Sequence, residues 1–202
     1  MSLYDFSKRF IDLVVSFLAL FLLSPLMLLI VVAVRLESRG NPLFCQVRAG
    51  RGAEPFMLFK FRTMRPDVDP YGNSPQDGRD PRLTKIGRWL RETSLDELPQ
   101  LLNVMMGEMS LVGPRPLYVV QVLEWNERQR RRLEVKPGLT GLAQISGRGS
   151  LTIEEKLELD VEYVEKRSFL LDMKILLYTF ISLFSPGHIY EKRYSEKHER
   201  RK

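Results

Sequence analysis

The uncharged stretch LVVSFLALFLLSPLMLLIVVAV, Leu13 to Val34, decides how this chain of 202 residues folds. A helix rises about 1.5 Å per residue, so these 22 residues are long enough to cross a hydrocarbon core of about 30 Å. A cleaved signal peptide usually has a shorter apolar region that ends in small residues, whereas this stretch continues into RLESRGNP. We therefore expect a permanent membrane segment within residues 1–36.

Ser24-Pro25 lies at the middle of the stretch and leaves the path of the segment open. Proline removes one helical hydrogen bond and clashes with the preceding turn, so a kink is expected. Cations flank both ends, and the positive-inside rule therefore selects no direction: Lys8, Arg9, Arg35 and Arg39. From these residues alone, a helix that turns at Ser24-Pro25 and leaves by the face it entered, and a kinked single-pass helix, are equally supported.

The composition limits what the rest of the chain can be. Its length suits one domain, and its single cysteine, Cys45, excludes an internal disulfide framework. No CxxC pair or histidine cluster offers a zinc site. The net charge of +6 favours anionic headgroups and phosphate-bearing ligands. Nucleic acid is disfavoured as a partner, because the cations are scattered and the densest run, ERQRRRLEVK, reads as one polar helix face.

The pattern after the membrane segment predicts a β-hairpin and then mostly helices. Two alternating runs around a glycine turn indicate strands near residues 43–48 and 56–63, followed by a loop rich in Pro, Gly and Asp. Helices are expected around 83–92, 97–106, 116–135 and 153–166, with an irregular glycine-dense segment, KPGLTGLAQISGRGS, between the last two. The apolar stretch SFLLDMKILLYTFISLFSPG is a helix, either in the membrane interface or in the core.

These expectations give a mostly α (α+β) fold, with helices along one membrane face. The expected division is a membrane helix over 1–36, a functional domain over 37–187 and a charged flexible tail over 188–202. Too few strands alternate with helices for a doubly wound sheet.

The acid pair Asp96-Glu97 in TSLDELPQLLNV has a structural and a chemical interpretation. Ser94 with Glu97 fits a capping box, and Asp96 could itself cap a helix whose first turn contains Pro99. Capping alone does not account for the cations that occur in short loop-like stretches of the chain: KFRTM, RETSLDELP, GPRP and GRGS. Arginine suits phosphate because its planar fork presents paired donors. A carboxylate can attack phosphorus, and its neighbour can hold Mg²⁺ against substrate phosphates.

Taken together, SLDELPQLLNV, MSLVGPRP, KPGLTGLAQISGR and KFRTM, with an N-terminal apolar segment interrupted by SP, resemble the bacterial sugar transferases. More narrowly, the chain is similar to the small monotopic phosphoglycosyl transferases, over roughly residues 8–184. The resemblance implies transfer of a sugar-1-phosphate from a UDP-sugar to polyprenyl phosphate, with release of UMP. It also implies Mg²⁺ as cofactor, inner-membrane lipid as surroundings and a site on the cytoplasmic face of a bacterial inner membrane. The membrane helix would re-enter at Ser24-Pro25.

The resemblance assigns roles to particular residues. Asp96 would be the nucleophile that forms a phosphosugar intermediate, and Glu97 the Mg²⁺ ligand. Asp160, in LELDVEY, would support the cations. The cations expected to line the site are Arg115, Arg91, Arg62, Arg148 and Lys60. Position 62 is an arginine where lysine also occurs in the family.

Several points stay open at this stage. Asp96 could instead act as a base in a one-step transfer, and a non-enzymatic scaffold that binds anionic lipid is a third possibility. The single-domain form favours an N-acetylated sugar, chosen by the loops around 67–80 and 138–150. The downstream pathway and the oligomeric state are not readable.

Overall fold

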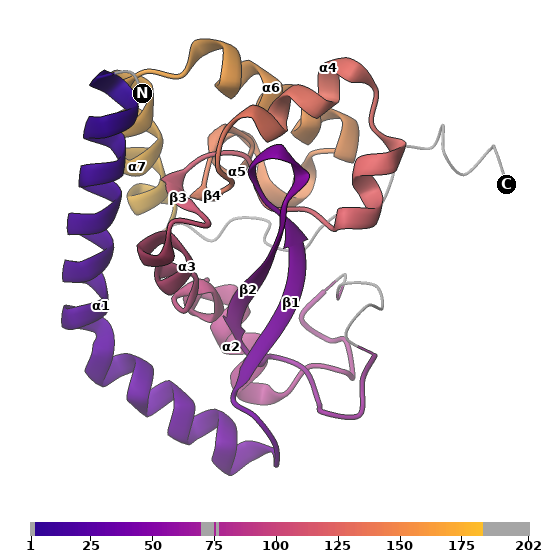
Figure 1. The fold of residues 1–202 in the computed structure, drawn as a ribbon. Coiled ribbons are helices and arrows are strands. Elements are labelled where there is room, and N and C mark those ends of the chain that lie inside the picture. The colour runs from indigo at the N-terminus through magenta and orange to yellow at the C-terminus, as the bar shows by residue number, and fades with distance from the viewer. Residues whose placement is uncertain (1–2, 70–74, 76, 184–202) are drawn as a thin grey trace, which may run out of the picture.

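The computed structural model describes residues 3–69, 75 and 77–183, with the side chain of Arg148 excepted. Figure 1 shows one long helix along the edge of a mostly helical body. The longer elements are α1 (Leu3–Glu37), β1 (Leu43–Ala49), β2 (Pro55–Phe61), α2 (Lys85–Glu92), α3 (Gln100–Met106), α6 (Ile153–Lys166) and α7 (Phe169–Leu183). The shorter strands and α-helices are β3 (Ser110–Val112), α4 (Glu127–Arg130), β4 (Gly138–Thr140) and α5 (Leu142–Ser146). The 3-10 turns are η1 (Arg51–Ala53), η2 (Leu95–Glu97), η3 (Val119–Glu124), η4 (Arg131–Glu134) and η5 (Arg148–Ser150).

The N-terminal helix α1 stays helical through Ser24-Pro25 and bends along its length (Figure 1). Pro25 has no N–H to donate to the carbonyl of Phe21, four residues earlier. The hydroxyl of Ser24 donates to that same carbonyl over 2.8 Å. The Ser-Pro pair therefore bends the helix and satisfies the carbonyl that the proline frees, so the predicted break is a bend within one continuous helix.

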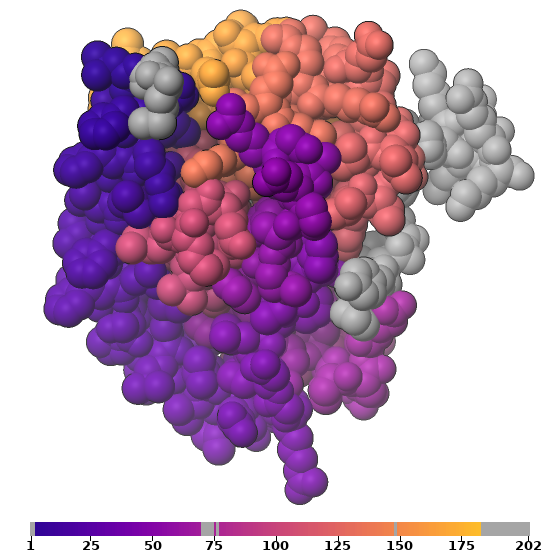
Figure 2. Space-filling view, in the orientation of Figure 1, coloured from indigo at the N-terminus to yellow at the C-terminus, as the bar shows by residue number. Residues whose placement is uncertain are grey.

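The polarity of α1 is inverted relative to a helix on a water-soluble protein. Its buried residues include Asp12 and Ser16, whereas Phe21 and Leu22 are 70% and 71% exposed. Within the described residues it is the one helix long and apolar enough to cross a membrane. Figure 2 shows its side chains along one edge of the molecule. Since contiguous apolar surface of this kind is costly in water, the protein is membrane-associated through α1.

The hairpin of β1 and β2 is antiparallel, with Leu43 opposite Phe61, as its alternating sequence predicts. Apolar residues of β2 join two clusters. Phe56 and Leu58 pack with α3, α6 and α7, and Phe61 packs with Leu90 of α2 and the second half of α1. The strand thus fixes α1, α2 and α3 around one end of the hairpin.

The strand β3, just before GPRP, pairs in parallel with β4, which lies in the KPGLTG segment that the sequence predicted to be irregular. Pairing continues past the strand end, because the N–H of Gly113 donates to Thr140 over 2.9 Å and that of Gly138 donates to Pro114 over 2.8 Å. A Cβ on Gly138 would lie 2.1 Å from the nitrogen of Gly113, so only glycine permits this approach. The glycines therefore let the two backbones approach closely, and the hydrogen bonds between them fix the start of the GPRP turn.

The expected helix over 116–135 is wrong, because three short helical pieces occupy this region: η3, α4 and η4. The chain is extended at Trp125, and Asn126 starts a new helix by accepting from the N–H of Gln129. By contrast, α6 coincides with the predicted 153–166.

The last helix, α7, buries Asp172 and Ile175 but leaves much apolar surface open, with Leu170 80% and Phe180 61% exposed. This pattern favours the interfacial over the core interpretation. The predicted tail over 188–202, and parts of the loop predicted to select the sugar, lie outside the described residues.

Candidate active site

The acid pair lies on the short turn η2, between α2 and α3. Ser94 precedes it in the left-handed region, at φ 58° and ψ 13°, and its side chain makes no capping hydrogen bond. Pro99, not Asp96, occupies the N-cap position of α3. Both capping interpretations are therefore wrong, and helix capping gives no reason for two carboxylates at this position.

Glu97 is held by two cations from different segments. Its Oε1 lies 2.8 Å from Nζ of Lys60, on β2, and 2.7 Å from a guanidinium nitrogen of Arg115, in the GPRP turn. Burial alone would raise the pKa of Glu97, but Arg115 and then Lys60 outweigh it and lower that pKa well below its ordinary value. Glu97 is thus a fixed negative charge.

Asp96 has the opposite environment. It is 7% exposed, and within the described residues no hydrogen bond reaches its carboxylate. Burial raises its pKa from 3.8 to about 6, and the adjacent charge of Glu97 acts in the same direction. The charges that oppose this shift belong to Lys60, Arg91 and Arg115. At neutral pH Asp96 is therefore an ionised, poorly solvated carboxylate, which is a stronger nucleophile than an ordinary aspartate.

Arg91 is positioned at this site by the contact of α2 with the end of β2. Its Nε donates to the hydroxyl of Thr63 over 2.9 Å. Gly87, one turn earlier on α2, lies so close to the backbone at Thr63 that a Cβ on it would be 2.0 Å from the carbonyl oxygen of Thr63. The glycine in KIGRWL is therefore a packing requirement that brings Arg91 within reach of the acid pair.

Arg115 is held in place by a buried ion pair between Arg132 and Asp160, of which the sequence predicted only Asp160. Arg132 is 3% exposed and donates to Asp160 over 2.6 Å and to the backbone carbonyl of Arg115 over 2.5 Å. Its guanidinium also lies over the ring of Trp125, 4.7 Å from the centroid. Asp160 thus supports a site cation through Arg132. The run ERQRRRLEVK predicts one polar helix face, and for Arg132 this prediction is wrong.

Asn103 joins the acid-pair segment to the strand that carries Lys60. It is fully buried in α3, and its amide donates to the carbonyl of Met57 over 2.7 Å and accepts from the N–H of Phe59 over 3.1 Å. It thereby pairs with β2 as a neighbouring strand would. The signal was present, since an asparagine inside the apolar run PQLLNV demands buried partners.

The structure brings Asp96, Glu97, Lys60, Arg91 and Arg115 together. Arg62 is directed elsewhere: it is buried and donates to the carbonyl and the hydroxyl of Ser38, over 2.7 and 2.8 Å, at the end of α1. The backbone of Arg148 begins η5, and its side chain lies outside the described residues. Arg62 thus fixes the junction between the membrane helix and the hairpin.

The acid pair offers a minimal donor set for Mg²⁺. The described residues contain no group of three or more metal-binding side chains. Magnesium commonly binds through one or two carboxylates plus substrate phosphates, and Asp96 with Glu97 supplies that minimum. Within the described part of the chain, Oε2 of Glu97 has one contact at hydrogen-bond length, 3.5 Å from Arg115, so this oxygen is open to an ion and the residues present fit Mg²⁺.

Together, these features define a membrane-associated protein with an apolar helix and a centre in which three cations surround a pair of acids. The chain belongs to the bacterial sugar transferases, whose family model matches residues 3–186. The family and enzyme class predicted from the motifs are thereby confirmed.

Named relatives agree with this assignment. The chain is 49% identical to the sugar transferase EpsL of Bacillus subtilis, over 85% of this chain and 84% of that protein. It is 41% identical to the UDP-glucose:undecaprenyl-phosphate glucose-1-phosphate transferase of Caulobacter vibrioides, over 92% and 73%. It is 47% identical to the undecaprenyl-phosphate glucose phosphotransferase of Komagataeibacter xylinus, over 85% of this chain but 35% of that longer protein.

Proposed function

We propose that this chain transfers a sugar-1-phosphate from a UDP-sugar to undecaprenyl or another polyprenyl phosphate, by way of a phosphosugar intermediate on Asp96. The names of the relatives support the overall reaction, since two of them specify undecaprenyl phosphate as the acceptor. The observation that carries the intermediate is the contrast within the pair: Asp96 is buried with a raised pKa, whereas Glu97 is held ionised by two cations.

The chemistry takes two balanced steps. A carboxylate oxygen of Asp96 bonds to the phosphorus that bears the sugar, and the bond from that phosphorus to the bridging oxygen breaks, so its electron pair leaves with UMP. An oxygen of polyprenyl phosphate then bonds to the same phosphorus. The acyl-phosphate bond breaks, and the carboxylate of Asp96 is restored.

The surrounding cations make this attack possible. Two anions meet in the first step, and Lys60, Arg91 and Arg115 offset their repulsion. We propose Mg²⁺ as the cofactor, held by Glu97, where it would neutralise charge on the diphosphate. Arg115 keeps 38% of its side chain exposed, so it can shift from Glu97 toward a substrate phosphate.

Trapping tests the intermediate. Protein in detergent receives UDP-sugar labelled in the sugar-linked phosphate, with Mg²⁺ but without lipid acceptor. We expect release of UMP in proportion to enzyme, and label on the peptide that contains Asp96. Asp96→Asn should abolish both, whereas Glu162→Gln, which removes an acid paired with Lys166 on the exposed face of α6, should keep both. The one-step alternative predicts UMP release only with acceptor and no labelled protein.

The sugar is decided by a panel of donors. The sequence favours an N-acetylated sugar, while relatives are named for glucose or galactose transfer. UMP release should be measured with UDP-glucose, UDP-galactose and their N-acetylated counterparts, each at the same concentration. The donor with the largest kcat/KM identifies the substrate class.

We also propose that α1 re-enters the inner membrane, with the site on the cytoplasmic face. Its 35 residues extend about 52 Å, well beyond a hydrocarbon core of about 30 Å, and the bend lets both ends return to one face. Leu3→Cys and Arg39→Cys, each with Cys45→Ser, should react with an impermeant thiol reagent in inside-out vesicles only. Labelling of the two positions from opposite sides would establish a single-pass helix.

A further inference from the structure

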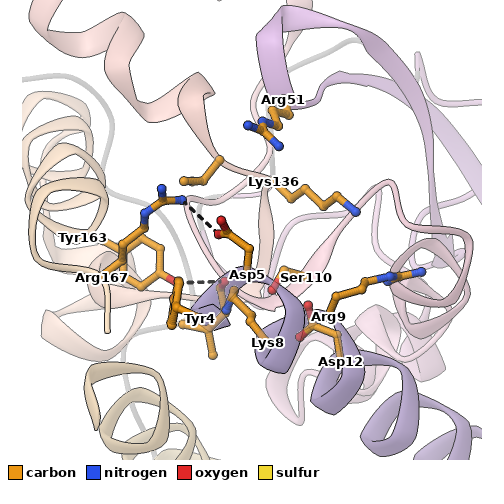
Figure 3. Close-up of a pocket in the computed structure, with 12 residues that line it drawn as sticks. Tyr4, Asp5, Lys8, Arg9, Asp12, Arg51, Ser110, Lys136, Tyr163 and Arg167 are labelled. Carbon is orange, nitrogen blue, oxygen red and sulfur yellow. Dashed lines mark hydrogen bonds and ion pairs between the residues drawn. The ribbon is translucent and has the colours of Figure 1, made fainter. Parts of the chain in front are cut away.

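A second charged site lies apart from the acid pair. A cavity of about 580 Å³ lies between the first turns of α1, the hairpin tip η1, the chain before β4 and the end of α6. Figure 3 shows the residues that line it. Its lining includes neither acid of the pair and none of the cations around them. The proposed function assigns it no role.

Cations outnumber acids in this lining. The basic residues are Lys8, Arg9, Arg51, Lys136 and Arg167, and the acidic ones are Asp5 and Asp12. Two of the cations have carboxylate partners, since Lys8 lies 2.7 Å from Asp172 and Arg167 lies 3.9 Å from Asp5. Figure 3 shows Arg9 and Lys136 on the side of the cavity opposite Arg167.

The remaining three cations have no carboxylate in salt-bridge contact within the described part of the chain. Arg9 donates to the carbonyls of Val104 and Met105 at the end of α3, over 2.6 and 2.9 Å, which carry no full charge. Lys136 and Arg51 make no side-chain hydrogen bond to a described residue. The cavity therefore has a positive side on which three cations face one lining acid, Asp12, that pairs with none of them in salt-bridge contact within the described residues.

Two of these cations converge on one point. A Cβ built on Gly107 would lie 3.3 Å from the guanidinium of Arg9 and 3.5 Å from the amine of Lys136. Burial lowers the pKa of Lys136, and the charges of Arg9 and Arg51 lower it further, while only Asp12 opposes them. Like charges held this close cost stability unless a ligand supplies the counter-charge.

We propose that this cavity binds the phosphate group of an anionic membrane lipid. Guanidinium and ammonium groups together suit a phosphate ester, because the fork orients the oxygens and the amine adds a point charge. The source is a lipid, since Phe6 and Phe10, on the same turns of α1, are 59% and 62% exposed and the uncharged stretch begins at Leu13. The cavity thus lies where headgroups meet hydrocarbon.

The test measures binding and uses no sugar donor, so its outcome is independent of the proposed function. The thermal unfolding midpoint of the full chain in detergent is followed during titration with short-chain phosphatidylglycerol. Diacylglycerol with the same chains lacks only the phosphate headgroup, and inorganic phosphate lacks the chains. At about ten times Kd, phosphatidylglycerol should raise the midpoint by about 3–5 °C, and diacylglycerol should not.

Variants locate the effect. Lys136→Gln should weaken lipid binding by about tenfold or more, and without lipid its midpoint should equal or exceed that of the wild type, because a repulsion is removed. Arg51→Gln, at an exposed position that does not threaten folding, should weaken binding as well. Lys156→Gln removes the same charge from α6, outside the cavity, and should respond as the wild type does.

Unchanged binding by both cavity variants, or an equal shift with diacylglycerol, would overturn the proposal. An equal shift with inorganic phosphate at the same concentration would overturn the assignment to a lipid.

Discussion

Replacing Asp96 with asparagine should stabilise the protein while it abolishes transfer. The pKa of Asp96 is about 6 in the folded chain and near 3.8 when solvated, so the folded state binds this proton more tightly than the unfolded state does. The free energy of unfolding therefore falls as pH rises between these two values, and it stays lower above them. At about 1.36 kcal/mol per pH unit, ionising Asp96 costs the fold about 3 kcal/mol, and Asp96→Asn avoids this cost.

Denaturant unfolding in detergent, at a series of pH values from about 4 to about 8, measures the effect. The stability of Asp96→Asn relative to wild type should rise by about 2.4 kcal/mol across this range, with most of the rise below about pH 6.5. Glu162→Gln, on the exposed face of α6, serves as the control and should show no such trend. If Asp96→Asn is less stable than wild type at the alkaline end, the surrounding cations outweigh burial and the account of a destabilised nucleophile is refuted.

Three other substitutions test the supports of the site. In the same denaturant assay, Glu97→Gln should destabilise the protein by about 2 kcal/mol near neutral pH, which is less than for a fully buried ion pair because Arg115 is partly exposed. This loss should shrink below about pH 4.5, where protonation begins to remove the stabilising charge from the wild-type carboxylate. Asn103→Ala should cost about 2–3 kcal/mol, because it leaves two groups of β2 without partners, and should lower kcat in the UMP assay. Arg132→Met should cost about 3–5 kcal/mol by leaving the charge of Asp160 buried alone, and the double change with Asp160→Leu should recover most of the loss in thermal unfolding.

The sequence predicted best where a signal is local. The start of α6 follows from Thr152, whose hydroxyl accepts from the N–H of Glu155 in a capping box that the sequence displays. The hairpin follows from strict alternation around its turn. A capping box also marks where the expected helix at 116–135 is interrupted, because Asn126 and Gln129 form one that starts a new helix within this range.

Contacts between distant segments could not be predicted in this way. The three-residue strands β3 and β4 are too short to show alternation, and their pairing joins segments about 28 residues apart in sequence. Arg132 has no local feature that separates it from its exposed neighbours, since its partner Asp160 is 28 residues away. The family motifs pointed to the acid pair, whose catalytic role stays a prediction, whereas Arg62, inside one of those motifs, turns toward Ser38.

The hydroxyl of Ser24 lets the membrane helix bend without requiring water to hydrogen-bond the backbone at the bend. Because it donates to the Phe21 carbonyl that Pro25 leaves without its usual donor, the turn exposes no bare oxygen that would draw water into the acyl layer. In the proposed re-entrant topology, the helix then turns inside the membrane without opening a leak for protons or ions beside it. Ser24→Ala should keep the proline and its angle but admit a hydrating molecule, so the permeability of sealed vesicles carrying this variant is the property to compare.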